Sequence, residues 1–134
     1  MNMTDMNITG EFEVSLQPQK TYSTGNDGIK LGRMSIDKTF TGDLSAVSQG
    51  EMLSAITTTE GSAGYVAIEQ VVGSLVGKSG SFALQHFGIM NKGQDRLVLE
   101  VVPDSGAREL VGLSGSMKII IKDGKHFYDF TFSL

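Results

Sequence analysis

The sequence predicts an all-β protein that forms a single antiparallel eight-stranded barrel. Apolar and polar residues alternate almost without a fault in the last nine residues, 126–134. Successive side chains of a strand point to opposite faces, so Tyr128 and Phe130 share one face and Asp129 and Thr131 the other. Closing a sheet into a barrel leaves such a final strand without a free edge. Seventeen glycines, spread between short apolar runs, suit the turns and bends of this fold.

The first half of the chain predicts four strands, over residues 8–17, 30–42, 43–59 and 62–77. In the first strand Phe12 stands between two glutamates, and in the second Met34 and Ile36 share one face. The third and fourth strands are separated by the turn pair Glu60-Gly61. The apolar spacing over residues 45–56 would also suit a helix. We favour a strand there because the strand that follows needs a partner.

The second half predicts four more strands, over residues 81–91, 95–103, 109–121 and 126–134. Each of them follows a group of turn residues, at positions 77–80, 91–93, 103–106 and 123–124. A turn roughly every dozen residues is typical of an up-and-down barrel. No shift in composition marks a domain boundary. We therefore assign residues 1–7 to a flexible N-terminus and residues 8–134 to one β-barrel domain.

Composition excludes several classes of function. The net charge is −4 and no cluster of lysine and arginine is present, so we expect no nucleic acid partner. No apolar run approaches the roughly 20 residues of a membrane helix, and we expect no membrane partner. There are no cysteines and no signal-peptide pattern at the start, which indicates a cytoplasmic protein.

The turn after the fourth strand predicts which side chains meet inside the barrel. With a loop of residues 77–78 or 77–80, odd positions before the loop face even positions after it. Glu69 then lies opposite or diagonal to His86, within reach of its side chain. Tyr65 shares this face with many apolar residues, so we assign the face to the barrel interior.

Alternation adds Tyr128 from the last strand and Lys38 from the second strand to the same interior. Ionisable groups in an apolar cavity have perturbed pKa values, as acid–base chemistry requires. We therefore predict Glu69 and His86 as catalytic residues. Lys38, Tyr65 and Tyr128 are the predicted ligand-binding residues. The alternative is that Glu69 and His86 only satisfy each other in a filled core.

No metal and no cofactor are predicted. The chain has no zinc-protease, phosphate-loop, dinucleotide-binding or serine-hydrolase motif, and its two histidines are forty residues apart. A second apolar stripe, around Leu53, Ile68 and Phe87, lies on the face opposite the predicted cavity. Apolar surface on this scale usually marks an oligomer interface, so we expect a homodimer or homotetramer.

Five segments of the chain resemble an uncharacterised bacterial family of domains of unknown function, whose fold is similar to that of allene oxide cyclase. They are KLGR at 30–33, KTFTGDL at 38–44, GSFALQH at 80–86, VVPDSG at 101–106 and ELVGL at 109–113. The resemblance implies an eight-stranded, lipocalin-like antiparallel barrel that is usually oligomeric. Residues 103–115 also resemble the glycine-turn segment of plant dirigent proteins, whose barrels steer cyclisation or coupling of apolar substrates. No catalytic motif of those proteins matches this chain.

Three functions remain open at this point. The protein could be an isomerase or cyclase that binds a small apolar ligand and uses His86 and Glu69 to move protons. It could be a non-catalytic, lipocalin-like carrier with the same cavity. It could also be a filled structural barrel that acts through its oligomer surface.

Overall fold

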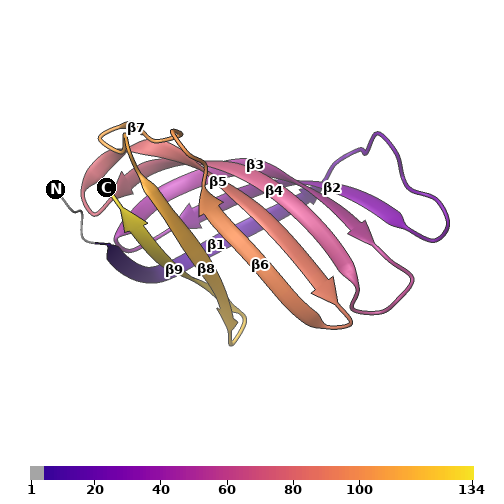
Figure 1. The fold of residues 1–134 in the computed structure, drawn as a ribbon. Coiled ribbons are helices and arrows are strands. Elements are labelled where there is room, and N and C mark those ends of the chain that lie inside the picture. Colours follow the sequence, from indigo (N-terminus) through magenta and orange to yellow (C-terminus); the bar gives the residue numbers. More distant parts are fainter. Residues whose placement is uncertain (1–4) are drawn as a thin grey trace.

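The structure, a computed structural model, describes residues 5–134 and consists of strands, turns and loops (Figure 1). The strands are β1 (Met6–Pro18), β2 (Lys30–Phe40), β3 (Leu44–Ile56), β4 (Ala63–Leu75), β5 (Lys78–Asn91), β6 (Gln94–Val101), β7 (Ala107–Arg108), β8 (Ser114–Lys122) and β9 (Lys125–Ser133). No helix occurs among residues 5–134, so none there could cross a membrane.

The strands form one closed antiparallel barrel. Their order is β4-β3-β2-β1-β9-β8-β6-β5, and pairing of β4 with β5 closes the ring. The short β7 is an extra strand that pairs only with the start of β5. The predicted all-β, eight-stranded barrel is thus confirmed, and the segment at 45–56 is a strand as expected.

Two details of the prediction were wrong. The segment predicted as a strand over 109–121 begins as a strand only at Ser114, because Arg108 and Gly112 have positive φ angles of 56° and 89° that break the extended chain. The β4–β5 loop consists of Val76 and Gly77 rather than residues 77–78 or 77–80. Both of these residues have positive φ, the geometry of a tight hairpin turn, although valine rarely adopts it.

The N-terminal assignment changes slightly. Part of the predicted flexible segment 1–7 lies outside the described residues. Within them, β1 already begins at Met6 and pairs with the end of β9.

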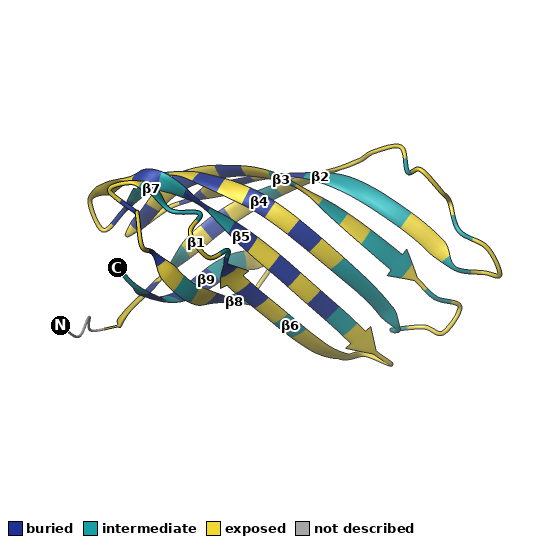
Figure 2. Cartoon of the chain, turned by 45° about the horizontal axis from the view of Figure 1, so that its top comes forward, coloured by how far each residue is buried: buried dark blue, intermediate teal, exposed yellow. Residues whose placement is uncertain are grey.

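One end of the barrel is filled by a hydrophobic core. Burial alternates along each strand, visible as blue and yellow bands in Figure 2. Large inward side chains such as Phe40, Phe82, Tyr128 and Phe130 are almost fully buried at this end. The β6–β8 connection adds Leu110, which is 1% exposed. The strand predicted to start at residue 109 starts later because Leu110 lies in this connection and covers the end of the barrel.

The opposite end of the barrel is open and uneven. Strands β2 to β6 project beyond the short β8–β9 hairpin (Figure 1). Strands β6 and β8 share a single registered pair, Glu100 with Ser116, whereas the other neighbouring strands of the barrel form continuous ladders. The inward-facing residues of this end therefore have fewer neighbours and surround free space.

Candidate functional site at the open end of the barrel

A buried polar cluster lies between the filled core and the open end. Its centre is Glu69 of β4, whose side chain is fully buried. Lys38 of β2 donates a hydrogen bond to Glu69 Oε2 at 2.7 Å, and Ser48 of β3 donates to Oε1 at 2.7 Å. His86 Nε2 of β5 lies 2.5 Å from Oε2. Four adjacent strands thus each contribute one residue to this set, which we call the polar cluster.

Gly50 allows the strand next to Glu69 to approach closely. It is the cross-strand partner of Glu69 on β3. A Cβ atom at this position would lie only 2.6 Å from Glu69 Cα and 2.1 Å from the Ile68 carbonyl oxygen. The absence of a side chain therefore permits the local strand spacing that places Ser48 against the carboxylate.

Glu69 is a fixed anion. Burial raises the pKa of its carboxyl. The hydrogen bond from His86, the charge of Lys38 and the hydrogen bonds from Lys38 and Ser48 lower that pKa by more, to about 2. Glu69 is therefore ionised throughout the neutral range, with its carboxylate held by Lys38, Ser48 and His86.

The hydrogen bond to Glu69 orients the imidazole of His86. A carboxylate only accepts hydrogen bonds, so Nε2 must carry a proton and donate it. Nδ1 then has no hydrogen-bond partner among residues 5–134. Since no buried side-chain nitrogen or oxygen in that range lacks a partner, Nδ1 is not fully buried, and the ring of His86 lines the cavity above the cluster.

Lys38 is held from two sides. Its ammonium nitrogen lies 5.1 Å from the centroid of the Phe12 ring and 5.8 Å from that of Phe40. Both distances are typical of cation–π interactions. The ammonium and the Glu69 carboxylate balance each other in a site where an unpaired charge would be strongly destabilising.

A cavity of about 320 Å³ lies above the polar cluster and opens toward the projecting strand ends. Lys38, His86 and Tyr65 line it, and the Tyr65 and His86 ring centroids are 6.3 Å apart. Most of the remaining wall is apolar, from Phe12, Val14, Leu16, Ile36, Met52, Ala67, Leu97, Ile119 and Ile121. Asp95 and His126 are the other polar residues of the lining.

Of the five residues predicted for the site, the structure brings four together. Glu69 and His86 are in direct contact, and Lys38 is hydrogen-bonded to the same carboxylate. The ring of Tyr65 lies beside that of His86 in the cavity wall. Glu69 lies behind the lining rather than in it. Whether these residues bind a ligand or act in catalysis stays a prediction.

Tyr128 faces the interior as predicted but lies in the core, away from the cavity. Its hydroxyl donates a hydrogen bond to the Thr41 carbonyl at 2.8 Å and accepts one from the Leu44 amide at 3.2 Å. Its ring packs edge-on against Phe40 at a centroid distance of 5.8 Å. Gly10 leaves room for the hydroxyl, since a Cβ there would lie 2.4 Å from it. Tyr128 is thus a structural residue of the closed end.

Sequence reasoning missed three polar members of the site, Ser48, Asp95 and His126. Ser48 has the same parity as Met52 on β3, so the alternation that placed Met52 inside could have found it. His126 lines the cavity mouth from the start of β9, and its ring lies tilted against Phe12 at a centroid distance of 5.3 Å. No group of three histidine, cysteine or acidic side chains within residues 5–134 is placed to hold a metal ion.

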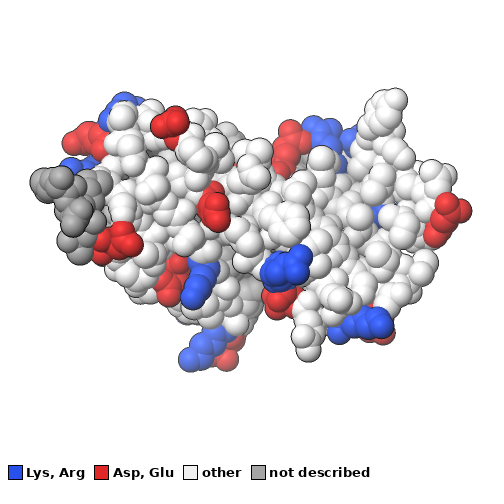
Figure 3. All heavy atoms as spheres, in the orientation of Figure 1, with Lys and Arg blue, Asp and Glu red and all other residues white. Residues whose placement is uncertain are grey.

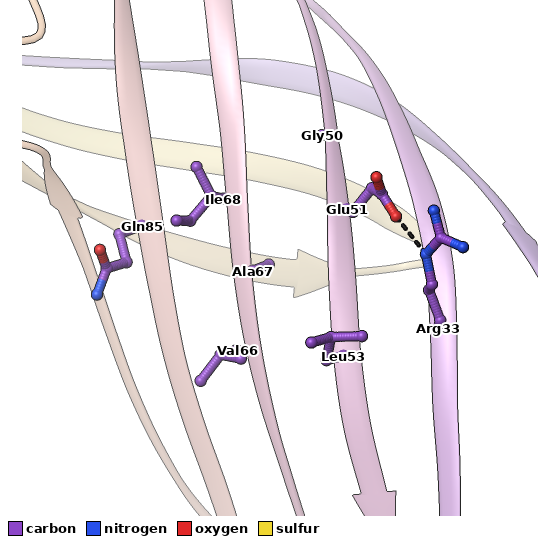
Figure 4. Close-up of a pocket in the computed structure, with 8 residues that line it drawn as sticks. All are labelled: Arg33, Gly50, Glu51, Leu53, Val66, Ala67, Ile68 and Gln85. Carbon is purple, nitrogen blue, oxygen red and sulfur yellow. Dashed lines mark hydrogen bonds and ion pairs between the residues drawn. The ribbon is translucent and has the colours of Figure 1, made fainter. Parts of the chain in front are cut away.

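A second hollow lies on the outside of the barrel (Figure 4). It measures about 810 Å³ and is floored by Leu53, Val66 and Ile68, which are all about half exposed. An ion pair between Arg33 and Glu51, 2.5 Å apart, borders it. The hollow carries no cluster of chemically reactive groups, so we place the candidate site in the smaller, interior cavity.

Charge is spread thinly over the surface. On the face shown in Figure 3, basic and acidic side chains lie close to one another in small mixed groups. Wide uncharged areas separate one group from the next. Such a distribution offers no extended basic patch on this face.

A family model described as a protein of unknown function, DUF3224, matches residues 8–132. The chain belongs to the DUF3224 family. It is also similar to a crystal structure of a DUF3224 protein of unknown function from Shewanella oneidensis MR-1, with 63% identity, a TM-score of 0.94 and 96% of each chain covered. No curated protein matches the chain.

These comparisons confirm the predicted membership of an uncharacterised family with a barrel fold. The relative is bacterial, which supports the predicted bacterial origin. Both the family model and the crystal structure are described as of unknown function, so neither assigns a role to the site residues.

Proposed function

We propose that this DUF3224 protein binds a small apolar ligand in the cavity above His86 and acts on it as an isomerase or cyclase by acid–base chemistry. The observation that carries the proposal is the unpaired Nδ1 of His86. The His86 ring lines a mostly apolar cavity of about 320 Å³, while Nε2 is held by an ionised carboxylate.

The geometry gives the residues distinct roles. His86 Nδ1 would accept a proton from the ligand or return one to it, and Glu69 would stabilise the imidazolium that forms in between. Glu69 is therefore a positioning residue in this proposal, because it does not line the cavity. Lys38 supplies a fixed positive charge beside a developing anion, and Tyr65 packs against the ligand.

A non-catalytic carrier is the second candidate, since it would use the same cavity. The two functions differ in whether protons of the ligand exchange with water. Small molecules extracted from the purified protein after incubation in D2O should carry deuterium on carbon if the protein is an enzyme. The same extract from a His86→Gln variant should not. Bound molecules without deuterium in either sample would favour the carrier.

We expect diethyl pyrocarbonate to modify His86 at Nδ1 in the folded protein, since Nε2 is engaged by Glu69 and the ring lines the cavity. In a His126→Gln variant all imidazole modification then reports on His86. Saturating 1-octanol should slow the reaction several-fold because it fills the cavity, as measured by absorbance and peptide mass spectrometry. A folded protein whose His86 resists the reagent, or reacts equally fast with 1-octanol present, would contradict the proposed site.

We also propose that the protein is a homodimer or homotetramer in which copies meet through the outer face of β3, β4 and β5. Leu53 and Ile68 there are 55% and 56% exposed, and Val66 and Phe87 extend the same apolar face. An apolar face of this kind favours association.

Light scattering at micromolar concentration should therefore give a dimer or tetramer mass for the wild-type chain. Replacing Ile68 by Glu should shift the protein to monomers, since a charge would be buried without a partner. The matched control is Ile120→Glu, an outward position on β8 with similar exposure, which should leave the mass unchanged. A monomeric wild-type protein would refute the oligomer.

A further inference from the structure

The cavity above His86 is one of two compartments at the open end of the barrel. The second, of about 330 Å³, lies on the inner face of the projecting strand ends, and we call it the outer groove. Met34, Met52 and Met90 line the outer groove together with Ile56 and Leu97. Methionine side chains are flexible and adapt to apolar chains of different shape.

Tyr65 stands between the two compartments. Together with Met52, Asp95 and Leu97 it lines both of them, so its ring forms part of the wall that they share. No hydrogen bond within residues 5–134 involves the Tyr65 hydroxyl. The hydroxyl oxygen is therefore accessible, because no buried side-chain oxygen in this range lacks a partner. The ring is therefore held by packing alone and not anchored at its tip.

The Tyr65 ring can occupy its position only because its cross-strand neighbour is glycine. Tyr65 pairs with Gly88 across β4 and β5. A Cβ atom at position 88 would lie 2.2 Å from Tyr65 Cε1 and 2.7 Å from Cδ1, so the ring lies directly over the glycine backbone. Any side chain at position 88 would push the ring away from the sheet, into the space between the compartments.

We propose that Tyr65 is a gate that determines how long a ligand the site accepts. Resting on Gly88, the ring separates the cavity above His86 from the outer groove. A ligand with an unbranched apolar chain too long for the inner cavity displaces the ring and extends its chain over the methionines. The proposal rests on the proposed function, since it requires that the inner cavity binds the ligand.

The test uses the 1-alkanols from 1-pentanol to 1-decanol as probes, with affinities measured by calorimetry. Each methylene buried in an apolar site should raise affinity about fourfold. With the wild-type protein this gain should fall once the chain meets Tyr65, because displacing the ring opposes binding. With Tyr65→Ala the gain should continue, so long alkanols bind at least tenfold tighter than to the wild type. Short alkanols should gain nothing from the substitution.

Position 88 supplies a second, independent variant. Gly88→Ala should weaken the binding of all the longer alkanols by pushing the ring into their path. The double variant Tyr65→Ala/Gly88→Ala should behave like Tyr65→Ala, because the glycine acts only through the ring. Tyr65→Phe keeps the ring, so its gain in affinity should fall at the same chain length as in the wild type, since the hydroxyl has no partner. Should Tyr65→Ala fail to fold by circular dichroism, Tyr65→Leu replaces it.

The outcomes separate the two proposals. Equal dependence on chain length in the wild type and in Tyr65→Ala, with binding intact, overturns the gate and leaves the proposed function standing. A Gly88→Ala effect that persists in the double variant overturns the gate as well. A wild-type protein that binds none of the alkanols overturns the proposed function, and the gate with it.

Discussion

Replacing Glu69 by Ala is expected to lower the free energy of unfolding by about 3–5 kcal/mol. Glu69 is fully buried and is the counter-ion of Lys38, whose side chain is 5% exposed. Removing the carboxylate leaves a buried ammonium without an anion, and it also leaves Ser48 and His86 without their hydrogen-bond acceptor. Urea denaturation followed by circular dichroism measures the loss.

The matched control removes both charges together. A double variant Lys38→Met/Glu69→Leu should recover most of the lost stability, because apolar residues of similar size can replace a buried ion pair at little cost. A single variant that loses less than about 1 kcal/mol would mean that the cluster is hydrated, and the double variant would then bring no recovery.

The stability of the protein should fall steeply in acid, by on the order of 3 kcal/mol from Glu69 alone. The pKa of Glu69 is lowered in the folded state from 4.5 to about 2. Because the folded-state pKa is the lower one, the ionised carboxylate stabilises the fold fully above about pH 4.5. This contribution is lost progressively as the pH falls from there through about 2.

Urea unfolding at a series of pH values between neutrality and strong acid tests this dependence. Glu69→Gln cannot titrate at this position, so its unfolding free energy should change less over the same range than that of the wild type. Parallel curves for the two proteins would show that Glu69 titrates alike in the folded and unfolded states. In that case the hydrogen bonds to its carboxylate would not form as described.

The interior placement of Glu69 and His86 followed from parity alone. With the turn at Val76-Gly77, Glu69 pairs with Leu84, two residues before the His86 partner that a loop of residues 77–78 would have given. Side chains alternate with a period of two, so a shift by two leaves every residue on its predicted face. The contact of Glu69 with His86 therefore survived an error in the loop. A three-residue loop would have reversed it.

The period-two pattern and the turn residues determined the strands, the closed barrel and the inward face of each strand, because these depend on short-range geometry. The tertiary structure decided the depth of each residue along the barrel axis. Tyr128 and Tyr65 both face inward, yet one lies in the filled core and the other at the cavity. Depth depends on the stagger of all eight strands around the barrel, which no single hairpin fixes. For the same reason, only the folded barrel could show that Lys38 and Ser48 meet at the carboxylate of Glu69.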